Sequence, residues 1–187
     1  MNKIIVAICG SMAATAVPAY LLFLKANFNQ AEITVILTRN ARYFLAKGAI
    51  AHLPGVTVVD AEAGHDPDGL RVNHTQLIEG ADIFLVLPAT ANFLGKAANG
   101  IADELVTTCF LAYSGPKVIF PAMNADMLAS KYVQRNISTL RSFGDSVILG
   151  GVASSVATGK VGPGALPDVR AVMEAVGAAG LPVRGVG

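Results

Sequence analysis

Runs of apolar residues recur along the chain and alternate with segments of mixed polarity, a pattern typical of a parallel β-sheet covered by helices. The runs are continuous rather than alternating, which indicates strands buried on both faces of the sheet. We therefore predict an α/β fold in which residues 1–187 form one domain. The predicted strands cover residues 4–9, 33–37, 56–59, 83–87, 117–120 and 146–149.

The segments between these runs predict helices and loops. Pro18 falls inside the first helical segment and is expected in a kinked or displaced first half. Asn99 and Gly100 interrupt another helical segment, and His74 begins a short helix before the fourth strand. Helices are predicted near residues 12–27, 41–49, 96–109, 128–143 and 168–176, an acidic loop at 60–69, and a frayed tail at 177–187.

The composition narrows the class of partner. Hydrophobic residues make up 53% of the 187 residues, and the net charge of +1 is spread without charged runs, so no nucleic-acid partner is expected. We expect small molecules, peptides or further copies of the chain instead. So much apolar surface on a short chain favours a homo-oligomer.

The cysteines and histidines form no metal or disulfide pattern. Cys9 and Cys109 lie in apolar segments without CxxC spacing. The histidines, at positions 52, 65 and 74, also lack the spacing of metal ligands. We predict buried, reduced cysteines and no metal site.

Residues 4–24 carry no charge and lie between Lys3 and Lys25, so a secretory or membrane segment has to be considered. However, Gly10-Ser11 and Pro18 divide this run into a β-branched strand and a helix. We therefore predict a cytoplasmic protein without a membrane partner.

The first strand runs into Gly10 and Ser11 and then into a helix, a layout typical of phosphate-binding sites. A plain strand-to-helix connection is the alternative. The second strand ends in Thr38, Arg39 and Asn40. A dinucleotide site would have a G-x-G-x-x-G turn and an acidic residue at these two points, and both are missing. Hydroxyl and basic groups suit a phosphate, which favours a mononucleotide such as FMN over NADP.

Two later strands also end in polar motifs, at the edge of the sheet where ligands sit in α/β proteins. The first, Pro88-Ala-Thr-Ala-Asn92, combines small residues with hydrogen-bonding side chains, which suits a planar ligand close to the backbone. In the second, Pro121-Ala-Met-Asn-Ala-Asp-Met127, Asn124 is either a working group or a cap for the next helix. His74, at a helix start, is either structural or a proton-transfer group.

Residues 150–167 are rich in glycine and small side chains and follow the last predicted strand. Such a segment can close over a substrate as a lid, although a mobile connection fits equally well. No cysteine occurs in this segment.

Five motifs occur in order along the chain: Gly10-Ser-Met12, His74 eight residues before Asp82, Pro88 to Asn92, Ala98 to Asp103, and Pro121 to Met127. Together they resemble the motifs of the homo-oligomeric flavin-containing cysteine decarboxylases, and the resemblance covers nearly the whole chain. It implies a Rossmann-like (flavodoxin-like) three-layer fold around a six-stranded parallel sheet. It also implies FMN bound between subunits of a trimer, or of a dodecamer built of trimers.

The resemblance implies roles for individual residues. His74 matches the catalytic histidine of the family, and Asn124 matches the asparagine that holds the substrate carboxylate. Met123 and Met127 then belong to the substrate wall. The implied cofactor-binding residues are Gly10, Ser11, Met12, Thr38, Asn40, Phe44, Thr90, Ala91, Asn92 and Ala122.

In this family the flavin removes two electrons from the Cβ–S unit of a cysteine, after which the carboxylate departs readily. Phosphopantothenoylcysteine decarboxylases then reduce the product with a cysteine on the late flexible segment. Residues 150–164 contain no cysteine, so the reaction is expected to stop at the enethiol. The chain therefore resembles more closely the lantibiotic-type peptidyl-cysteine decarboxylases, such as that of epidermin biosynthesis. Their substrate is a precursor peptide with a C-terminal cysteine, and their aminoenethiol product later cyclises into an S-(2-aminovinyl)-cysteine-type ring.

Two other functions stay open, namely phosphopantothenoylcysteine decarboxylation in coenzyme A biosynthesis and a non-catalytic, flavin-binding regulatory subunit. The presence of both His74 and Asn124 favours catalysis. The chain departs from the family at Leu128, where these enzymes commonly carry Trp. Loss of that aromatic ring bears on peptide specificity more than on the chemistry.

Overall fold

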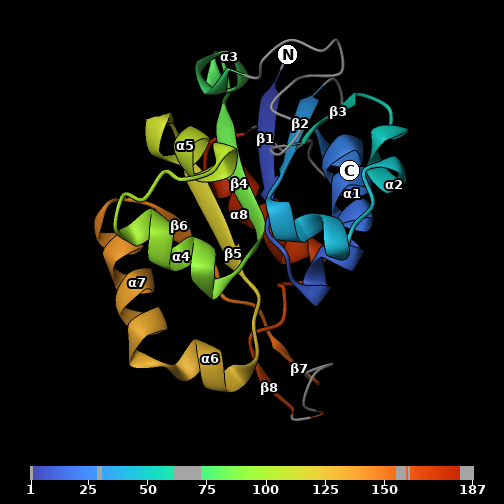
Figure 1. Ribbon diagram of the computed structural model, residues 1–187. Helices are drawn as coiled ribbons and strands as arrows, with labels where there is room; N and C mark the ends of the chain where they lie inside the picture. The colour runs from blue at the N-terminus through green and yellow to red at the C-terminus, as the bar shows by residue number, and fades with distance from the viewer. Residues whose placement is uncertain (1, 29–30, 61–72, 155–158, 160, 182–187) are drawn as a thin grey trace.

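The computed structural model describes residues 2–28, 31–60, 73–154, 159 and 161–181, and its centre is a six-stranded parallel sheet (Figure 1). The strand order is β3-β2-β1-β4-β5-β6. This is the order of the Rossmann fold, and it confirms the predicted three-layer, Rossmann-like architecture. The strands are β1 Lys3–Ile8, β2 Glu32–Leu37, β3 Val56–Asp60, β4 Ile83–Ala89, β5 Lys117–Pro121 and β6 Ser146–Val147.

Helices cover both faces of the sheet, and the packing of β1 explains why its residues after Lys3 are all apolar. Ile4, Val6 and Ile8 pack in one core cluster with side chains of α1 and α8. Ile5 and Ala7 point to the other face and pack with α4, α5 and α7. The helical segments are η1 Met12–Ala16, α1 Val17–Asn27, η2 Arg39–Tyr43, α2 Gly48–Ala51, α3 His74–Ile78, α4 Ala91–Ala98, α5 Leu105–Ala112, α6 Ala125–Ala129, α7 Lys131–Ser142 and α8 Val169–Ala178.

Four predicted helical segments are divided in the structure, and in two of them an irregularity at Pro18 and an interruption at Asn99-Gly100 were expected. Residues 12–27 begin as the 3-10 helix η1 and continue as α1, because Pro18 has no N–H to donate and is accommodated in a first turn. Residues 99–104 separate α4 from α5, and Gly100 has a φ of +67° there. The segment 41–49 is divided between η2 and α2, and the helix predicted at 128–143 between α6 and α7.

The carboxyl-terminal part is more regular than predicted. Within the predicted lid, β7 (Val152–Ser154) and β8 (Val161–Pro163) form an antiparallel pair. The prediction of a frayed tail from residue 177 is wrong for its first residues, because α8 extends to Ala178 and Leu181 is buried in the core. Residues 61–69 of the acidic loop, 155–158 and 160 of the lid, and 182–187 of the tail lie outside the described residues.

No helix in the described part of the chain is long and apolar enough to cross a membrane. The uncharged stretch at 4–24 forms most of β1, then η1 and much of α1. Its apolar side chains contribute to both core clusters.

Replacing Leu21 by alanine tests the packing of α1 on the sheet. The side chain is completely buried, so we expect the free energy of unfolding to fall by about 2–5 kcal/mol, measured by urea denaturation. Leu22→Ala is the matched control on the same helix, because half of that side chain is exposed. We expect the control to change stability by only about 0.5 kcal/mol. Equal losses in the two variants would contradict the buried face assigned to α1.

Candidate functional site

Backbone hydrogen bonds join the carboxyl ends of four strands side by side and continue beyond the strands themselves. They fix the positions of the loops that follow β1, β2, β4 and β5 relative to one another. The walls of the site are therefore held by the backbone of the sheet itself. The bonds run from Thr38 N to Ile8 O (3.0 Å), from Cys9 N to Pro88 O (3.1 Å) and from Ala122 N to Ala89 O (2.9 Å).

A cavity of about 900 Å³ lies over these strand ends. It includes the point between β1 and β4 where the strand order reverses, which is where ligands bind in open α/β sheets. Met123 and Met127, expected at the substrate, also line this first cavity. The expected cofactor residues that line it are Gly10, Ser11, Thr38, Asn40, Thr90, Ala91, Asn92 and Ala122.

The turn after β1 passes very close to the loop after β2. A Cβ atom on Gly10 would lie 2.5 Å from the backbone carbonyl carbon of Asn40, so no larger residue fits without a shift of the backbone. The next residue, Ser11, has a buried hydroxyl at the cavity wall with no hydrogen-bond partner among the described residues. A buried, unpartnered hydroxyl is unfavourable, and a phosphate oxygen bound there would remedy this. The residues of this turn therefore fit a phosphorylated cofactor.

The loop after β4 forms another wall. Thr90 caps α4, because its hydroxyl accepts a hydrogen bond from the N–H of Phe93 (3.3 Å). Cys9 also lines the cavity, and burial raises the pKa of its thiol to about 12, against the opposing effect of hydrogen bonds with Thr90. Burial likewise raises the pKa of Cys109 to about 12. Both thiols are therefore protonated at neutral pH and are poor nucleophiles, and both are buried and unpaired, as predicted.

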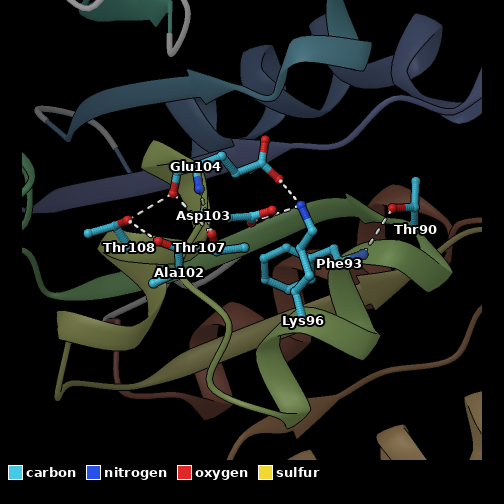
Figure 2. A network of polar contacts seen from close by, with 8 residues as sticks. All are labelled: Thr90, Phe93, Lys96, Ala102, Asp103, Glu104, Thr107 and Thr108. Atoms are coloured by element: carbon cyan, nitrogen blue, oxygen red, sulfur yellow. Dashed lines mark hydrogen bonds and ion pairs between the residues drawn. The ribbon is translucent and has the colours of Figure 1, made fainter.

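Three charged side chains form a network on the same wall (Figure 2). The ammonium of Lys96, on α4, lies 2.9 Å from Oδ1 of Asp103 and 3.5 Å from Oε1 of Glu104. Hydrogen bonding between Lys96 and Asp103 raises the pKa of the ammonium and lowers the pKa of the carboxyl. The sequence pattern did not identify these side chains as site residues, although Asp103 ends one of the five motifs.

Asn124 follows β5 and caps α6. Its side-chain oxygen accepts a hydrogen bond from the N–H of Met127 (2.8 Å). Because only the amide oxygen can accept that bond, the NH2 end of the amide remains available to a ligand. The two interpretations of Asn124, helix cap and working group, are thus compatible in one side chain.

A second cavity of about 440 Å³ adjoins the first, and Ser11, Ala122 and Met123 line both. Asn124, η1, the start of α1 and the β7–β8 hairpin complete its walls. A hydrogen bond from Met123 N to Gly164 O (2.9 Å) holds the end of the hairpin against this loop. Gly164 has a φ of +118°, and a Cβ there would collide with the carbonyl oxygen of Met123. The hairpin is therefore anchored where the two cavities meet.

Several residues singled out from the sequence lie elsewhere than expected. Met12, assigned to the cofactor, lines only the second cavity. Phe44, also assigned to the cofactor, lines neither cavity and packs against the core. Leu128 is buried in the other core cluster, so the replacement of Trp at this position concerns the packing of α6 rather than a cavity wall.

His74 lies at the opposite end of the sheet from Asn124. It begins α3, which precedes β4, whereas Asn124 follows β5. Figure 1 shows α3 beside the beginning of β4 and α6 beyond the end of β5. The seven residues of β4 span about 20 Å. A single copy of the chain therefore does not bring His74 and Asn124 together.

The fold and the cavity agree with a comparison of the chain with protein-family models. The model of the flavoprotein family matches residues 1–179. The chain belongs to this family. Among the residues that the structure describes, no three His, Cys, Asp or Glu side chains are placed to hold a metal ion.

Individual relatives of this flavoprotein include cysteine decarboxylases of two kinds. Mersacidin decarboxylase from a Bacillus species is 37% identical over 79% of this chain and 73% of the relative. A probable phosphopantothenoylcysteine decarboxylase from Streptococcus mutans is 34% identical over 94% and 97% of the two chains. The solved structure of the epidermin biosynthesis protein EpiD from Staphylococcus aureus has a TM-score of 0.81 and 27% identity, covering 92% of this chain and 99% of that one.

These findings confirm the resemblance to the flavin-containing cysteine decarboxylases that the five motifs indicated. Solved structures with the same fold include FMN-dependent cysteine decarboxylases, which supports the expectation of FMN. Some relatives are longer proteins. The chain spans 42% of the bifunctional coenzyme A biosynthesis proteins from Escherichia coli.

Gly10→Ala tests the close approach of the loops after β1 and β2 at one end of the first cavity. The added methyl group would push the loop of Asn40 away, so we expect flavin binding to weaken about tenfold or more, equivalent to about 1.4 kcal/mol. Titration of the flavin-free protein with FMN, followed by flavin fluorescence, measures the change. Gly48→Ala is the control, because a Cβ there meets nothing within 4 Å. Equal affinity in both variants would show that the crossing at Gly10 does not shape the site.

Proposed function

We propose that this flavoprotein catalyses the FMN-dependent oxidative decarboxylation of a C-terminal cysteine in a ribosomally made precursor peptide. The observation that carries the proposal is the wall shared by the two cavities, beside which Asn124 has its NH2 group free. The first cavity suits the cofactor and the second suits the end of a substrate. A cysteine carboxylate bound by Asn124 would lie where the two meet.

The cofactor assigned to the first cavity is FMN. Its phosphate would lie at the Gly10 turn, with the hydroxyl of Ser11 as a hydrogen-bonding partner. Thr38 and Asn40 line the same end of the cavity, and the small residues from Ala89 to Ala91 leave room for a planar ring. The membership of the flavoprotein family and the FMN-dependent relatives support this assignment. Bound FMN supplies an acceptor for two electrons.

The overall reaction removes two hydrogens and carbon dioxide from the terminal cysteine and leaves an aminoenethiol. The hydrogens come from the Cβ–H and S–H bonds, so a base is needed near the cysteine side chain. An imidazole is suited to that task, and we assign it to His74. The NH2 group of Asn124 would orient the carboxylate until its bond to Cα breaks.

His74 would reach the substrate from a second copy of the chain. The strand length between His74 and Asn124 within one copy supports this arrangement. Large apolar side chains are half exposed on α5, which packs against α3, and on α1, as expected for contacts between copies. We therefore propose a homo-oligomer, either a trimer or a dodecamer built of trimers, with the site between subunits. The exposed side chains meant here are Leu22, Phe23 and Leu111.

The aminoenethiol is proposed as the final product because no thiol is positioned to reduce it. Residues 150–164 contain no cysteine, and the two cysteines of the chain are buried with raised thiol pKa values. The similarity to a phosphopantothenoylcysteine decarboxylase makes that activity the second candidate. Lack of a late cysteine argues against it. The described residues that line the second cavity are mostly apolar and carry no charge, which also suits a peptide end better than a phosphorylated substrate.

The β7–β8 hairpin is proposed as the lid over the substrate. It lines the second cavity and is anchored at Met123, beside Asn124. Closure there would exclude water from the carboxylate and favour its loss as carbon dioxide. We place the enzyme in the cytoplasm, where its two thiols remain reduced.

Mass spectrometry of an aerobic reaction tests the proposed function. The purified protein is mixed with FMN, a panel of peptides ending in cysteine, and phosphopantothenoylcysteine. We expect a peptide to lose carbon dioxide and two hydrogens together. The control panel carries the same peptides with C-terminal serine, which has no thiol to oxidise.

Loss of carbon dioxide alone from phosphopantothenoylcysteine would show that the second candidate function, phosphopantothenoylcysteine decarboxylation, is the correct one. Reaction of the serine peptides would show that the thiol is not the oxidised group. No change in any substrate, with FMN bound, would favour a regulatory subunit.

Mixing two inactive variants tests whether the site lies between copies. His74→Asn and Asn124→Asp each remove one side chain of the proposed pair, and the carboxylate introduced by the second substitution would still cap α6. We expect each variant alone to bind FMN and to turn over less than about 1% of wild type. After the subunits are exchanged at equal amounts, random pairing would restore about a quarter of the sites. Turnover of the same peptide before and after mixing measures this.

A double variant carrying both substitutions is the control, because mixing it with itself cannot restore a site. If turnover does not recover although subunit exchange is confirmed, His74 and Asn124 act in different sites or come from the same copy.

A further inference from the structure

The Lys96–Asp103–Glu104 network has no part in the reaction described above, yet it lies on the wall of the cofactor cavity. It connects α4 to the loop that precedes α5. Glu104 also caps α5 in a reciprocal arrangement with Thr107. The network is therefore held from both ends and has a fixed position relative to the cavity.

With the phosphate at the turns after β1 and β2, the order of the strands would place this network near the ring of the cofactor. The phosphate end is formed by loops after β1 and β2, whereas α4 follows β4, on the other side of β1. Neighbouring strands lie about 4.8 Å apart, so the loops after β2 and β4 are about 10 Å apart. A cofactor with its phosphate at Ser11 and Asn40 would extend its ring system toward α4 and Lys96.

The network carries an excess of negative charge. Two carboxylates and one ammonium leave one net negative charge, and Lys96 and Glu104 have only 21% and 23% of their side chains exposed. Partly buried charges act on their neighbours more strongly than charges in water do. Asp103 is 55% exposed, so its effect is screened more by solvent.

We propose that the Lys96–Asp103–Glu104 network sets the reduction potential of the bound flavin. A flavin that takes up two electrons and one proton gains one negative charge. The two carboxylates oppose that charge and lower the potential, and Lys96 limits the effect by neutralising one of them. This inference rests on the proposed function, because it requires FMN in the first cavity.

A lowered potential suits an enzyme that must pass its electrons outward. Residues 150–164 contain no cysteine that can receive them. The reduced flavin can instead give two electrons, with its proton and one more from solvent, to dioxygen, which forms hydrogen peroxide and restores the oxidised flavin. By making the reduced flavin less stable, the network would favour its reoxidation by dioxygen.

The midpoint potential of protein-bound FMN, measured without substrate against a reference dye, tests the proposal. For Lys96→Met we expect binding of the reduced flavin to weaken about tenfold more than binding of the oxidised flavin, a shift of about 30 mV to more negative potential. Glu104→Gln should shift the potential in the positive direction, and Asp103→Asn in the same direction by less. Lys96→Arg should stay near the wild-type value, because it keeps the charge.

Two further variants make the result decisive. Lys131→Met removes the same charge from an exposed position on α7 and should leave the potential unchanged. The triple variant Lys96→Met, Asp103→Asn, Glu104→Gln lacks all three charges and should have a higher potential than wild type. It still tests the proposal if Lys96→Met alone fails to fold. If the network had a purely structural role, its variants would lower the stability of the protein, but Lys96→Met and Glu104→Gln would not shift the midpoint potential in opposite directions.

Equal potentials in Lys96→Met and Lys131→Met, or shifts of the same sign in Lys96→Met and Glu104→Gln, would overturn the proposal. A wild-type protein that binds no FMN would overturn the proposed function instead. If the variants shift the midpoint potential as expected but the protein decarboxylates no cysteine peptide, the role of the network would be supported and the proposed substrate would be wrong. The two failures are therefore distinguishable.

Discussion

The crossing of two loops at Gly10 and Asn40 is the constraint on which the site depends. Because β1 and β2 are adjacent and parallel, their following loops leave the sheet side by side, and only a residue without a Cβ lets them touch. This contact shapes the end of the cavity formed by the loops after β1 and β2 and places the Ser11 hydroxyl at its wall. The backbone hydrogen bonds between strand ends then carry the same alignment across to Ala122, beside Asn124.

The sheet and the loops at its carboxyl edge were predictable because they depend on short stretches of sequence. A strand buried on both faces is apolar along its buried length, as β4 and the residues of β1 after Lys3 are, so it is visible without any knowledge of its neighbours. The polar residues that follow such strands must gather at one edge when the strands are parallel. That geometry accounts for the placement of Ser11, Thr38 and Thr90 at one cavity.

The rest depends on contacts that the sequence does not display. Pro18 and Asn99-Gly100 marked two of the breaks within the predicted helices, whereas the divisions of the segments 41–49 and 128–143 carried no such signal. The pairing of Lys96 with Asp103 and Glu104 arises only when the chain turns back after α4. His74 illustrates a different limit. Its motif is readable, but its position at the far end of the sheet follows from the topology, and the proposed function gives it a partner in a second copy.

The hydrogen bond between Asn124 and Met127 has an evolutionary consequence. The same amide supports the fold through its oxygen and is available for binding through its nitrogen. A substitution that removes both, such as alanine, would destabilise the fold even in a lineage that no longer needs turnover, because α6 loses its cap. Aspartate and serine keep the cap and lose the donor of the amide. Relatives that have lost the activity would therefore tend to carry aspartate or serine at the position of Asn124. Either residue at this position would then mark lost activity in a sequence.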